Sequence, residues 1–383
     1  MAMVRFGDVA ERVNTKEDRF NTDLVYYVGG DHIESNALTV SGRGKIKEAD
    51  LGPMFYFGFK PGDILFVTRN PHLRKCALVD FSGICSEKTL VIGTKDENVL
   101  SQKYLATVMQ SDDFWEFMEE NKSGSVNYFI NWTTLADYEF NLPSLARQRE
   151  LADLIWAAND LKESYKKAIT ATDEMLKAKF REMFGDAGDD ASRGGAETRS
   201  VELRGCITDI LGGKTPSMSN TEFYDGDVPF IKSGDVRKDY ISEGSVWLSD
   251  KALSKGGAKY VPKGSIIIVV RSATLKNELR VAVAEQDVVI NQDLKAFVPS
   301  HDYLPTFLML AIRIQADVLL GCVKTMLTSH IEVEEICKLK IPALPLSLQR
   351  EFVAIADKAE SAKANLKKSI TAIDQVMKGL INH

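Results

Sequence analysis

One short segment of the sequence resembles the end of a phosphate-binding loop. Gly213, Lys214 and Thr215 follow a second glycine, and a P-loop with this ending presents backbone N–H groups and a lysine to the phosphates of ATP or GTP. The full pattern also needs a glycine where this chain has Thr208. Pro216 in addition disfavours the helical conformation that the loop threonine must adopt. We therefore expect a turn that presents a basic side chain, and no nucleotide hydrolysis.

The patterns of other common active sites are missing from the sequence. There is no Pro-Pro dipeptide, so the chain lacks the Asp/Asn-Pro-Pro-aromatic motif of amino-methyltransferases. The one Glu-x-Lys, from Glu120 to Lys122, stands in a segment typical of a helix end, where a nuclease would need a strand. The five cysteines and five histidines show no metal-ligand spacing, which favours reduced thiols and argues against a transition-metal site. We expect a chain that catalyses no reaction alone and binds no cofactor or metal.

Charge and hydropathy limit the protein class further. The 54 acidic residues outnumber the 48 basic ones, so any basic surface for nucleic acid must be local. The longest apolar run near a strand, within 265–270, is far shorter than the roughly 20 residues of a membrane-spanning helix. The first residues also lack the apolar segment and cleavage site of a secretory signal. We therefore expect a cytoplasmic protein.

The chain contains an internal duplication. The segments that begin at Gln148 and Gln349 align without a gap over 33 residues, of which 12 are identical. Upstream, the strand-like run KPGDILFVTR at 60–69 matches PKGSIIIVVR at 262–271. A repeat of this length indicates that one unit, a domain followed by a helix, occurs twice. Within the strand-like runs we expect the core residues Ile64, Phe66, Ile266 and Ile268.

Each Gln-Arg-Glu segment has the periodicity of a long helix. Apolar or small residues recur in alternating steps of four and three, which is the seam of a coiled coil. Such a helix must bury its seam, and the other copy is an available partner. The Gly- and Asp-rich stretch between the copies is too short to run back along a whole helix, so we expect antiparallel pairing with a pseudo-twofold axis. The expected seam residues are Leu154, Ala158, Leu161, Tyr165 and Met175 in the first helix, and Ile355, Ala359, Leu366, Ile373 and Val376 in the second.

These patterns predict an α+β fold built as a tandem duplication of a mixed α/β domain, each copy followed by a long helix. The first domain is expected at 1–141 and its helix at 142–185. A linker is expected at 186–200, the second domain at 201–341 and the second helix at 342–383.

Several motifs in combination resemble a known family. They are GDILFVTRNPHLRKCALVDFSGICSEKTLVI at 62–92, NLPSLARQRELADLI at 141–155, YDGDVPFIKSGDV at 224–236 and VINQD at 289–293. Over essentially the whole chain, the sequence is similar to the specificity (S) subunits of type I restriction-modification systems.

The resemblance implies a DNA-binding subunit that is not itself an enzyme. Each domain would be a target-recognition domain that reads one half of a bipartite target, and the coiled coil would set the gap between the halves. The partners would be double-stranded DNA, two adenine-methylating modification subunits and two restriction subunits that translocate DNA. S-adenosylmethionine, ATP and Mg would be bound by those subunits and not by this chain.

Basic, amide and hydroxyl residues in the loops are the candidates for contacting DNA. Arginine and lysine can donate to guanine edges and phosphates, while Asn, Ser and Thr reach other bases or phosphates. For each candidate the alternative, an ordinary solvated side chain, stays open. The candidates are Arg43, Lys45, Lys47, Arg69, Asn70, His72, Arg74 and Lys75 in the first domain, and Lys214, Thr215, Lys232, Ser233, Arg271, Ser272, Lys276 and Arg280 in the second.

Two other functions remain open from the sequence. A coiled-coil scaffold that joins two identical protein partners without reading DNA would show the same duplication. A recognition subunit of a related methylation-based phage-defence system would also share these motifs and differ in its effector subunits.

Overall fold

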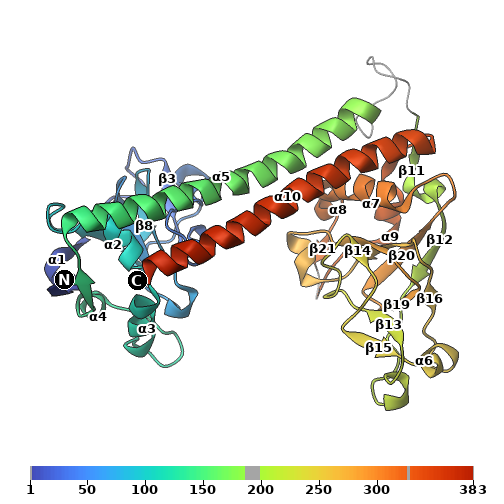
Figure 1. The fold of residues 1–383 in the computed structure, drawn as a ribbon, viewed down its shortest axis with the longest axis horizontal. Coiled ribbons are helices and arrows are strands. Elements are labelled where there is room, and N and C mark those ends of the chain that lie inside the picture. Colours follow the sequence, from blue (N-terminus) through green and yellow to red (C-terminus); the bar gives the residue numbers. More distant parts are fainter. Residues whose placement is uncertain (1, 186–198, 326–327, 383) are drawn as a thin grey trace. The chain divides into compact units, whose positions relative to one another are not determined.

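The structure, a computed structural model, describes residues 2–185, 199–325 and 328–382 (Figure 1). Two compact units divide the chain, one of Met1–Ala168 with Asn365–His383 and one of Ile169–Ala364. Each unit holds one mixed α/β domain and part of both long helices, α5 (Leu145–Phe184) and α10 (Leu346–Ile381). Of the predicted linker at 186–200, residues 186–198 lie outside the described residues. No helix among the described residues has the length and apolar character needed to span a bilayer.

The domain of the first unit packs two sheets against each other and covers one of them with helices. The sheet orders are β2-β9-β6-β7 and β4-β3-β8-β5. Strand β6 is buried on both faces, because Ile64 and Phe66 pack with the helices while Leu65 and Val67 face the second sheet. The elements are β1 (Ala2–Arg5), α1 (Phe6–Val9), β2 (Ala10–Val13), β3 (Tyr26–Val28), η1 (Gly30–His32), β4 (Gly44–Lys45), η2 (Ile46–Glu48), β5 (Phe55–Phe59), β6 (Ile64–Val67), η3 (Pro71–Leu73), β7 (Cys76–Leu78), β8 (Gly83–Ser86), β9 (Thr89–Thr94), α2 (Gln102–Val108), α3 (Asp112–Glu120), α4 (Trp132–Ala136) and β10 (Glu139–Leu142).

The domain of the second unit repeats this layering. Its sheet orders are β12-β20-β17-β18-β14 and β15-β13-β19-β16. Strand β17 corresponds to β6, with Ile266 and Ile268 on the helix side and Ile267 and Val269 on the other. The elements are β11 (Ser200–Glu202), η4 (Leu203–Cys206), β12 (Ile207–Gly212), η5 (Thr221–Phe223), β13 (Val228–Ile231), β14 (Tyr240–Ile241), β15 (Val246–Leu248), α6 (Asp250–Ser254), β16 (Tyr260–Val261), β17 (Ile266–Val269), η6 (Ala273–Lys276), β18 (Val281–Ala284), β19 (Val288–Ile290), β20 (Leu294–Pro299), α7 (Pro305–Ile314), α8 (Ala316–Gly321), β21 (Lys324–Thr325), β22 (Ser329–His330), α9 (Val333–Cys337) and β23 (Lys340–Pro342).

The shared turn before these two strands supports the duplication. Gly62 and Gly264 have φ angles of +93° and +84°, a conformation that favours glycine, and each stands two residues before its strand. The four strand residues predicted for the core, Ile64, Phe66, Ile266 and Ile268, are each 0% exposed. The predicted tandem α+β fold is confirmed.

A buried glutamine fastens the start of each long helix to its own domain. Gln148 accepts a hydrogen bond from the backbone N–H of Ser101 at 2.9 Å, and its amide group donates to the carbonyls of Val99 and Pro143. Gln349 does the same in the second unit, accepting from Leu304 at 2.8 Å. Both side chains are 0% exposed, so all their polar atoms must be satisfied internally. This explains why both copies have a glutamine at this position.

The long helices pair in opposite directions within each unit. In the first unit, Met377 near the end of α10 belongs to the same core as Ile155 near the start of α5. In the second unit, the ring of Phe180 near the end of α5 lies 5.2 Å from that of Phe352 near the start of α10. The predicted antiparallel pairing is therefore confirmed.

The seam predicted from the apolar pattern is wrong at several positions. Leu154, Leu161, Met175 and Val376 are 45–58% exposed, and the buried residues in the first helix lie one position later, as at Ile155 and Leu176. The reason is that polar residues occupy part of the real seam, as Asn159, Lys162 and Lys363 show, and an apolar pattern cannot detect them. Of the other predicted seam residues, Ala359 is buried, and Ala158, Tyr165, Ile355, Leu366 and Ile373 are half-buried.

Candidate nucleic-acid interface

In the second unit, several predicted side chains lie where strands β13 and β19 end side by side. These two strands are parallel, and the N–H of Asn291 donates to the carbonyl of Ile231 at 3.0 Å. Lys232 and Ser233 follow the end of β13, while Asn291 and Gln292 follow the end of β19. The ends of neighbouring parallel strands are a common place for ligand-binding loops.

The loop with the Gly-Lys-Thr sequence docks onto the same place. The N–H of Lys214 donates to the carbonyl of Ile290 at 3.1 Å, and the Thr215 hydroxyl donates to Gln292 at 2.5 Å. A Cβ atom at Gly213 would lie 1.9 Å from the carbonyl oxygen of Asn291, so only glycine permits this approach. The glycine serves backbone packing, and Lys214 is left exposed at the surface.

The loop after β17 completes this group of residues. The N–H of Arg271 donates to the carbonyl of Asp293 at 3.2 Å, and the N–H of Ser272 donates to that of Ser329 at 3.1 Å. Arg271 is exposed, whereas Ser272 is half-buried and caps the short helix η6 by accepting from Thr274. The structure thus brings six predicted residues around the Asn291–Asp293 segment: Lys214, Thr215, Lys232, Ser233, Arg271 and Ser272.

Two predicted residues of the second domain are not tied to this group. Arg280 donates to Glu278 at 2.8 Å, which offsets part of its charge, and Lys276 is an exposed residue at the end of η6. The sequence prediction did not include two neighbours of this group, the exposed Gln292 and the buried Asn291, whose amide donates to Asp293 at 3.1 Å. Their signal was present, because two amide side chains directly follow an apolar strand.

In the first unit, the loop after β6 starts with two residues held by their neighbours. The Arg69 guanidinium donates to the carbonyl of Asn127 at 3.2 Å and lies 5.2 Å from the ring of Phe129. Asn70 adopts a left-handed conformation, with φ of 54°, and its N–H donates to the carbonyl of Tyr128 at 3.1 Å. The side chains of Arg69, Asn70 and the following His72 are exposed.

Arg74 has a structural partner within the first unit, and its role as a DNA contact stays a prediction. Its guanidinium donates to Asp112 at 2.6 Å, and both side chains are about one-third exposed. Asp112 also pairs with Lys378 at 3.1 Å, and its N–H donates to Asn382 at 2.8 Å. The hydrogen bond from Arg74, followed by that from Lys378, lowers the pKa of Asp112 below its ordinary value of 3.8.

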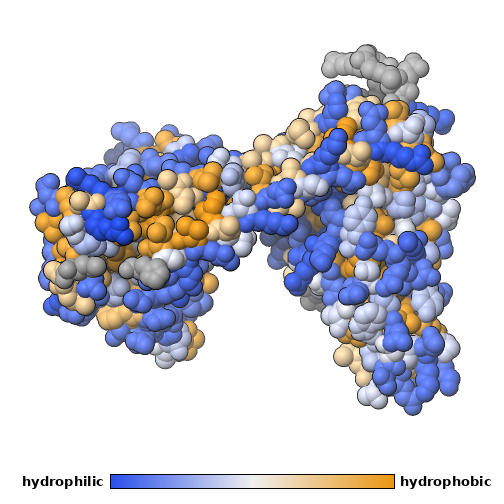
Figure 2. Space-filling view, in the orientation of Figure 1, coloured by the Kyte–Doolittle hydropathy of each residue, from blue (hydrophilic) through white to orange (hydrophobic). Residues whose placement is uncertain are grey.

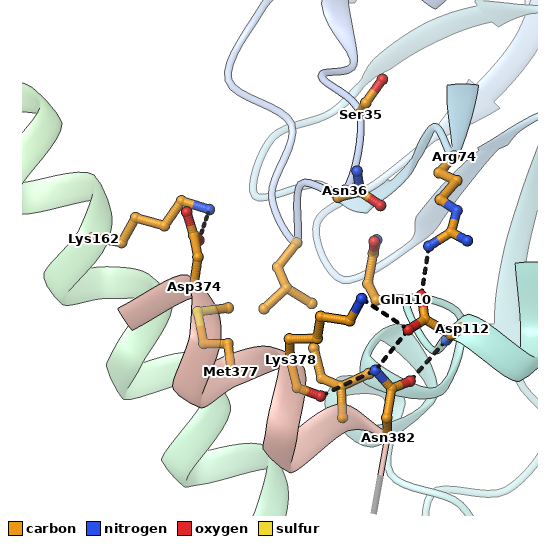
Figure 3. A pocket seen from close by; sticks show the side chains of 12 residues that line it. Ser35, Asn36, Arg74, Gln110, Asp112, Lys162, Asp374, Met377, Lys378 and Asn382 are labelled. Carbon is orange, nitrogen blue, oxygen red and sulfur yellow. Dashed lines mark hydrogen bonds and ion pairs between the residues drawn. The ribbon is translucent and has the colours of Figure 1, made fainter. Parts of the chain in front are cut away.

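Figure 3 shows these side chains on one wall of a cavity of about 410 Å³. Arg74 reaches it from the loop after β6, Asp112 from α3, and Lys378 with Asn382 from α10. The wall therefore joins the end of α10 to the candidate DNA-contacting loop within one unit.

The other basic residues of the first domain differ in how firmly they are held. Arg43 lies over the rings of Tyr26 and Phe81 at 4.2 and 4.8 Å, which orients its guanidinium. Lys75 donates to the carbonyl of Gly30 at 2.6 Å and is half-buried. Lys45 pairs with Glu48 at 2.7 Å in an exposed ion pair, and Lys47 is exposed.

The described residues contain no cluster of His, Cys, Asp and Glu that could hold a metal ion. The candidate side chains in each unit lie on loops and include N–H and O–H donors, and such groups can bind phosphates and base edges.

Comparison with known proteins supports the family that the motifs predict. The family model described as "Type I restriction modification DNA specificity domain" matches residues 204–375. The chain is related to the specificity subunits of type I restriction-modification systems. This confirms the family predicted from the motifs.

Members of the specificity-subunit family match at moderate identity. The EcoR124I/EcoR124II specificity subunit of Escherichia coli is 30% identical over 42% of this chain, and the match spans only 39% of that relative's length. The HindI specificity subunit of Haemophilus influenzae is 22% identical, with 80% of this chain and 81% of the relative covered.

Solved structures share the fold over nearly the whole chain. A structure from work on complex assembly and conformational transition of the type I system covers 99% of this chain and 96% of its own, with a TM-score of 0.59 and 19% identity. The type I S subunit from M. genitalium covers 99% and 94%, with a TM-score of 0.54 and 13% identity. At these identities the likeness concerns the fold alone.

Proposed function

We propose that the chain is the DNA-reading subunit of a type I restriction-modification complex. The observation that carries the proposal is that the same strand in each unit, β6 or β17, ends in an arginine-containing loop with further polar side chains at the surface. Two such loops in one chain suit a bipartite target, with one half-site for each domain. In this proposal the recognition domains are residues 1–141 and 201–341. The helices at 142–185 and 342–383 form the spacer that sets the gap and relates the domains by a pseudo-twofold axis.

The surface of α5 supports a role in binding partner subunits. Figure 2 shows apolar side chains gathered over the first part of this helix, where Leu154 and Leu161 are 52% and 45% exposed. Apolar residues grouped on a surface often mark protein interfaces. The partners in this proposal are two modification subunits and two restriction subunits, which would bind S-adenosylmethionine, ATP and Mg.

The acidic composition of the chain is consistent with such a complex. A net charge of -6 leaves little general attraction for the DNA backbone, so the partner subunits would supply much of the phosphate contact. The local groups of donors in this chain would then serve base recognition, and the complex would act on DNA in the cytoplasm.

A methylation assay with the purified complex tests the proposal. The chain and its modification subunit are incubated with S-adenosylmethionine and a pool of duplexes that carry random sequence, and the methylated duplexes are sequenced. We expect one sequence to be enriched when the chain is present. Methylation without sequence preference would reject the proposal and favour the scaffold that does not read DNA.

A further inference from the structure

A loop of the first domain is clamped to the candidate DNA-contacting residues by backbone hydrogen bonds. We name residues Ser123–Phe129 the finger loop. The N–H of Asn70 donates to the carbonyl of Tyr128 at 3.1 Å, and just after the loop the N–H of Ile130 donates to the carbonyl of Thr68 at 2.9 Å. Arg69 forms a β-bridge with Phe129. The finger loop therefore has a fixed place beside the end of β6.

The second domain holds the corresponding segment by the same bonds. The N–H of Ser272 donates to the carbonyl of Ser329 at 3.1 Å, and the N–H of Ile331 donates to that of Val270 at 2.9 Å. Arg271 forms the β-bridge with His330. Both copies therefore have the same backbone frame, two hydrogen bonds and a β-bridge, around the arginine that follows β6 or β17.

The side chains on this frame differ between the two copies. Tyr128 corresponds to Ser329, and Phe129 corresponds to His330. A surface for two identical protein subunits would need the same side chains in both copies. A surface that reads two different half-sites needs the same frame with different side chains, and this is the arrangement present.

The tip of the finger loop is open to solvent and partly apolar. Ser123 and Phe129 close the loop with two backbone hydrogen bonds of 2.9 and 3.0 Å, and Gly124 takes a φ of +96° that favours glycine. Beyond this closure, the side chain of Val126 is 84% exposed and that of Tyr128 is 37% exposed. These two side chains are therefore open to contact with another molecule.

Cationic groups border the tip. The Lys122 ammonium lies 4.5 Å from the ring of Tyr128, and the Arg69 guanidinium donates to the carbonyl of Asn127. Apolar and aromatic side chains with cations beside them match the chemistry of duplex DNA, where bases and sugars lie between phosphates.

We propose that the finger loop contacts bases in the half-site read by the first domain, through Val126 and Tyr128. This inference rests on the proposed function and extends it to a segment with no sequence motif of its own. In this proposal Arg69 reaches an adjacent phosphate, while Lys122 pairs with Glu119 at 2.6 Å and holds its ammonium over Tyr128.

The test compares variants of the intact chain in complex with its modification subunit. The wild-type motif is first determined by sequencing methylated DNA from a host that expresses both. Binding of Val126→Ala and Tyr128→Ala complexes is then measured with duplexes that carry the motif or have one half-site scrambled. We expect each variant to lose about 10-fold in discrimination at one half-site, as for the loss of a base contact, and to keep the other.

The matched control is Val99→Ala, which removes a 46%-exposed valine of the same domain that lies outside the finger loop. Thermal unfolding confirms that each variant folds, and Val126→Ala is the safer variant because its side chain is the more exposed. Unchanged discrimination at both half-sites overturns the inference. So does an equal loss at both with weaker binding of the modification subunit, since that result assigns the tip to a protein contact. If the wild-type complex itself reads no bipartite motif, the proposed function fails, and the inference fails with it.

Discussion

At the scale of single residues, Asp112 joins two parts of the first unit. It accepts from Arg74, which lies in the loop after β6, and from Lys378 on α10. Since α10 follows the second domain in sequence, a helix from one copy is bonded to the loop of the other. Through Asp112, Arg74 therefore helps to hold the loop after β6 against the end of α10.

We expect Asp112→Asn to lower the free energy of unfolding by about 1 kcal/mol at neutral pH. The substitution removes the carboxylate that two partly exposed ion pairs share. The folded protein holds the pKa of Asp112 below 3.8, so this stability is present above pH 3.8 and is lost as pH falls through the lower folded pKa. The measurement is chemical denaturation of both proteins between pH 7 and pH 3.5. The control is Asp113→Asn, at the exposed neighbouring residue. If the difference in free energy of unfolding between wild type and Asp112→Asn grows toward low pH, the assignment is contradicted.

The residues of the candidate site were predictable in part. Lys214, Thr215 and Arg271 follow strands or a glycine turn, and the fold does group them. Arg74 has the same sequence signal, yet its partner Asp112 is 38 residues away and only the fold brings them together. The finger loop has no pattern that marks it, since its place depends on backbone bonds to the loop after β6.

At the scale of elements, each unit contains a lysine within the helix seam and an aspartate opposite it. Lys162 pairs with Asp374 at 2.6 Å in the first unit, and Lys363 pairs with Asp173 at 2.5 Å in the second. Burial alone would lower the pKa of Lys363, but the hydrogen bonds that it donates to Asp173 and Glu360 raise it above its ordinary value. Paired charges in a seam favour one register, because a slip of one heptad would place Lys162 opposite Lys367.

Reversal of one charge is expected to destabilise the second unit. Lys363 has a side chain that is 9% exposed, so Lys363→Asp would set two carboxylates together in the seam and cost about 2 kcal/mol or more. The double variant Lys363→Asp with Asp173→Lys should recover most of this loss, as measured by chemical denaturation. Equal stability of the single and double variants would show that the pair does not select the register.

The same lysines explain the error in the predicted seam. The duplication and the long helices were predictable because identical positions and a 3.5-residue period are visible in the letters of the sequence. The register was not, since Leu154 and Leu161 have the right type but lie on the outer face, while Lys162 lies inside. Only the position of Asp374 shows why a lysine is tolerated there.

At the scale of the whole molecule, the exposed leucines of α5 give a test of the proposed partners. Because Leu161 is 45% exposed, Leu161→Asp is expected to change the free energy of unfolding by no more than about 0.5 kcal/mol. If α5 binds the modification subunit, less of that subunit will co-purify with the Leu161→Asp chain than with the wild type. The control is Asp160→Asn on the same helix, and full retention by Leu161→Asp would remove this face from the interface.

The central claim is that two domains of one chain read two half-sites at a fixed separation. Sequencing of methylated bases in a host that expresses the chain with its modification subunit tests it most directly. We expect one adenine-methylated motif made of two specific parts, with a gap of constant length and unspecified sequence between them. A contiguous motif, a gap of variable length or methylation without a motif would contradict the claim.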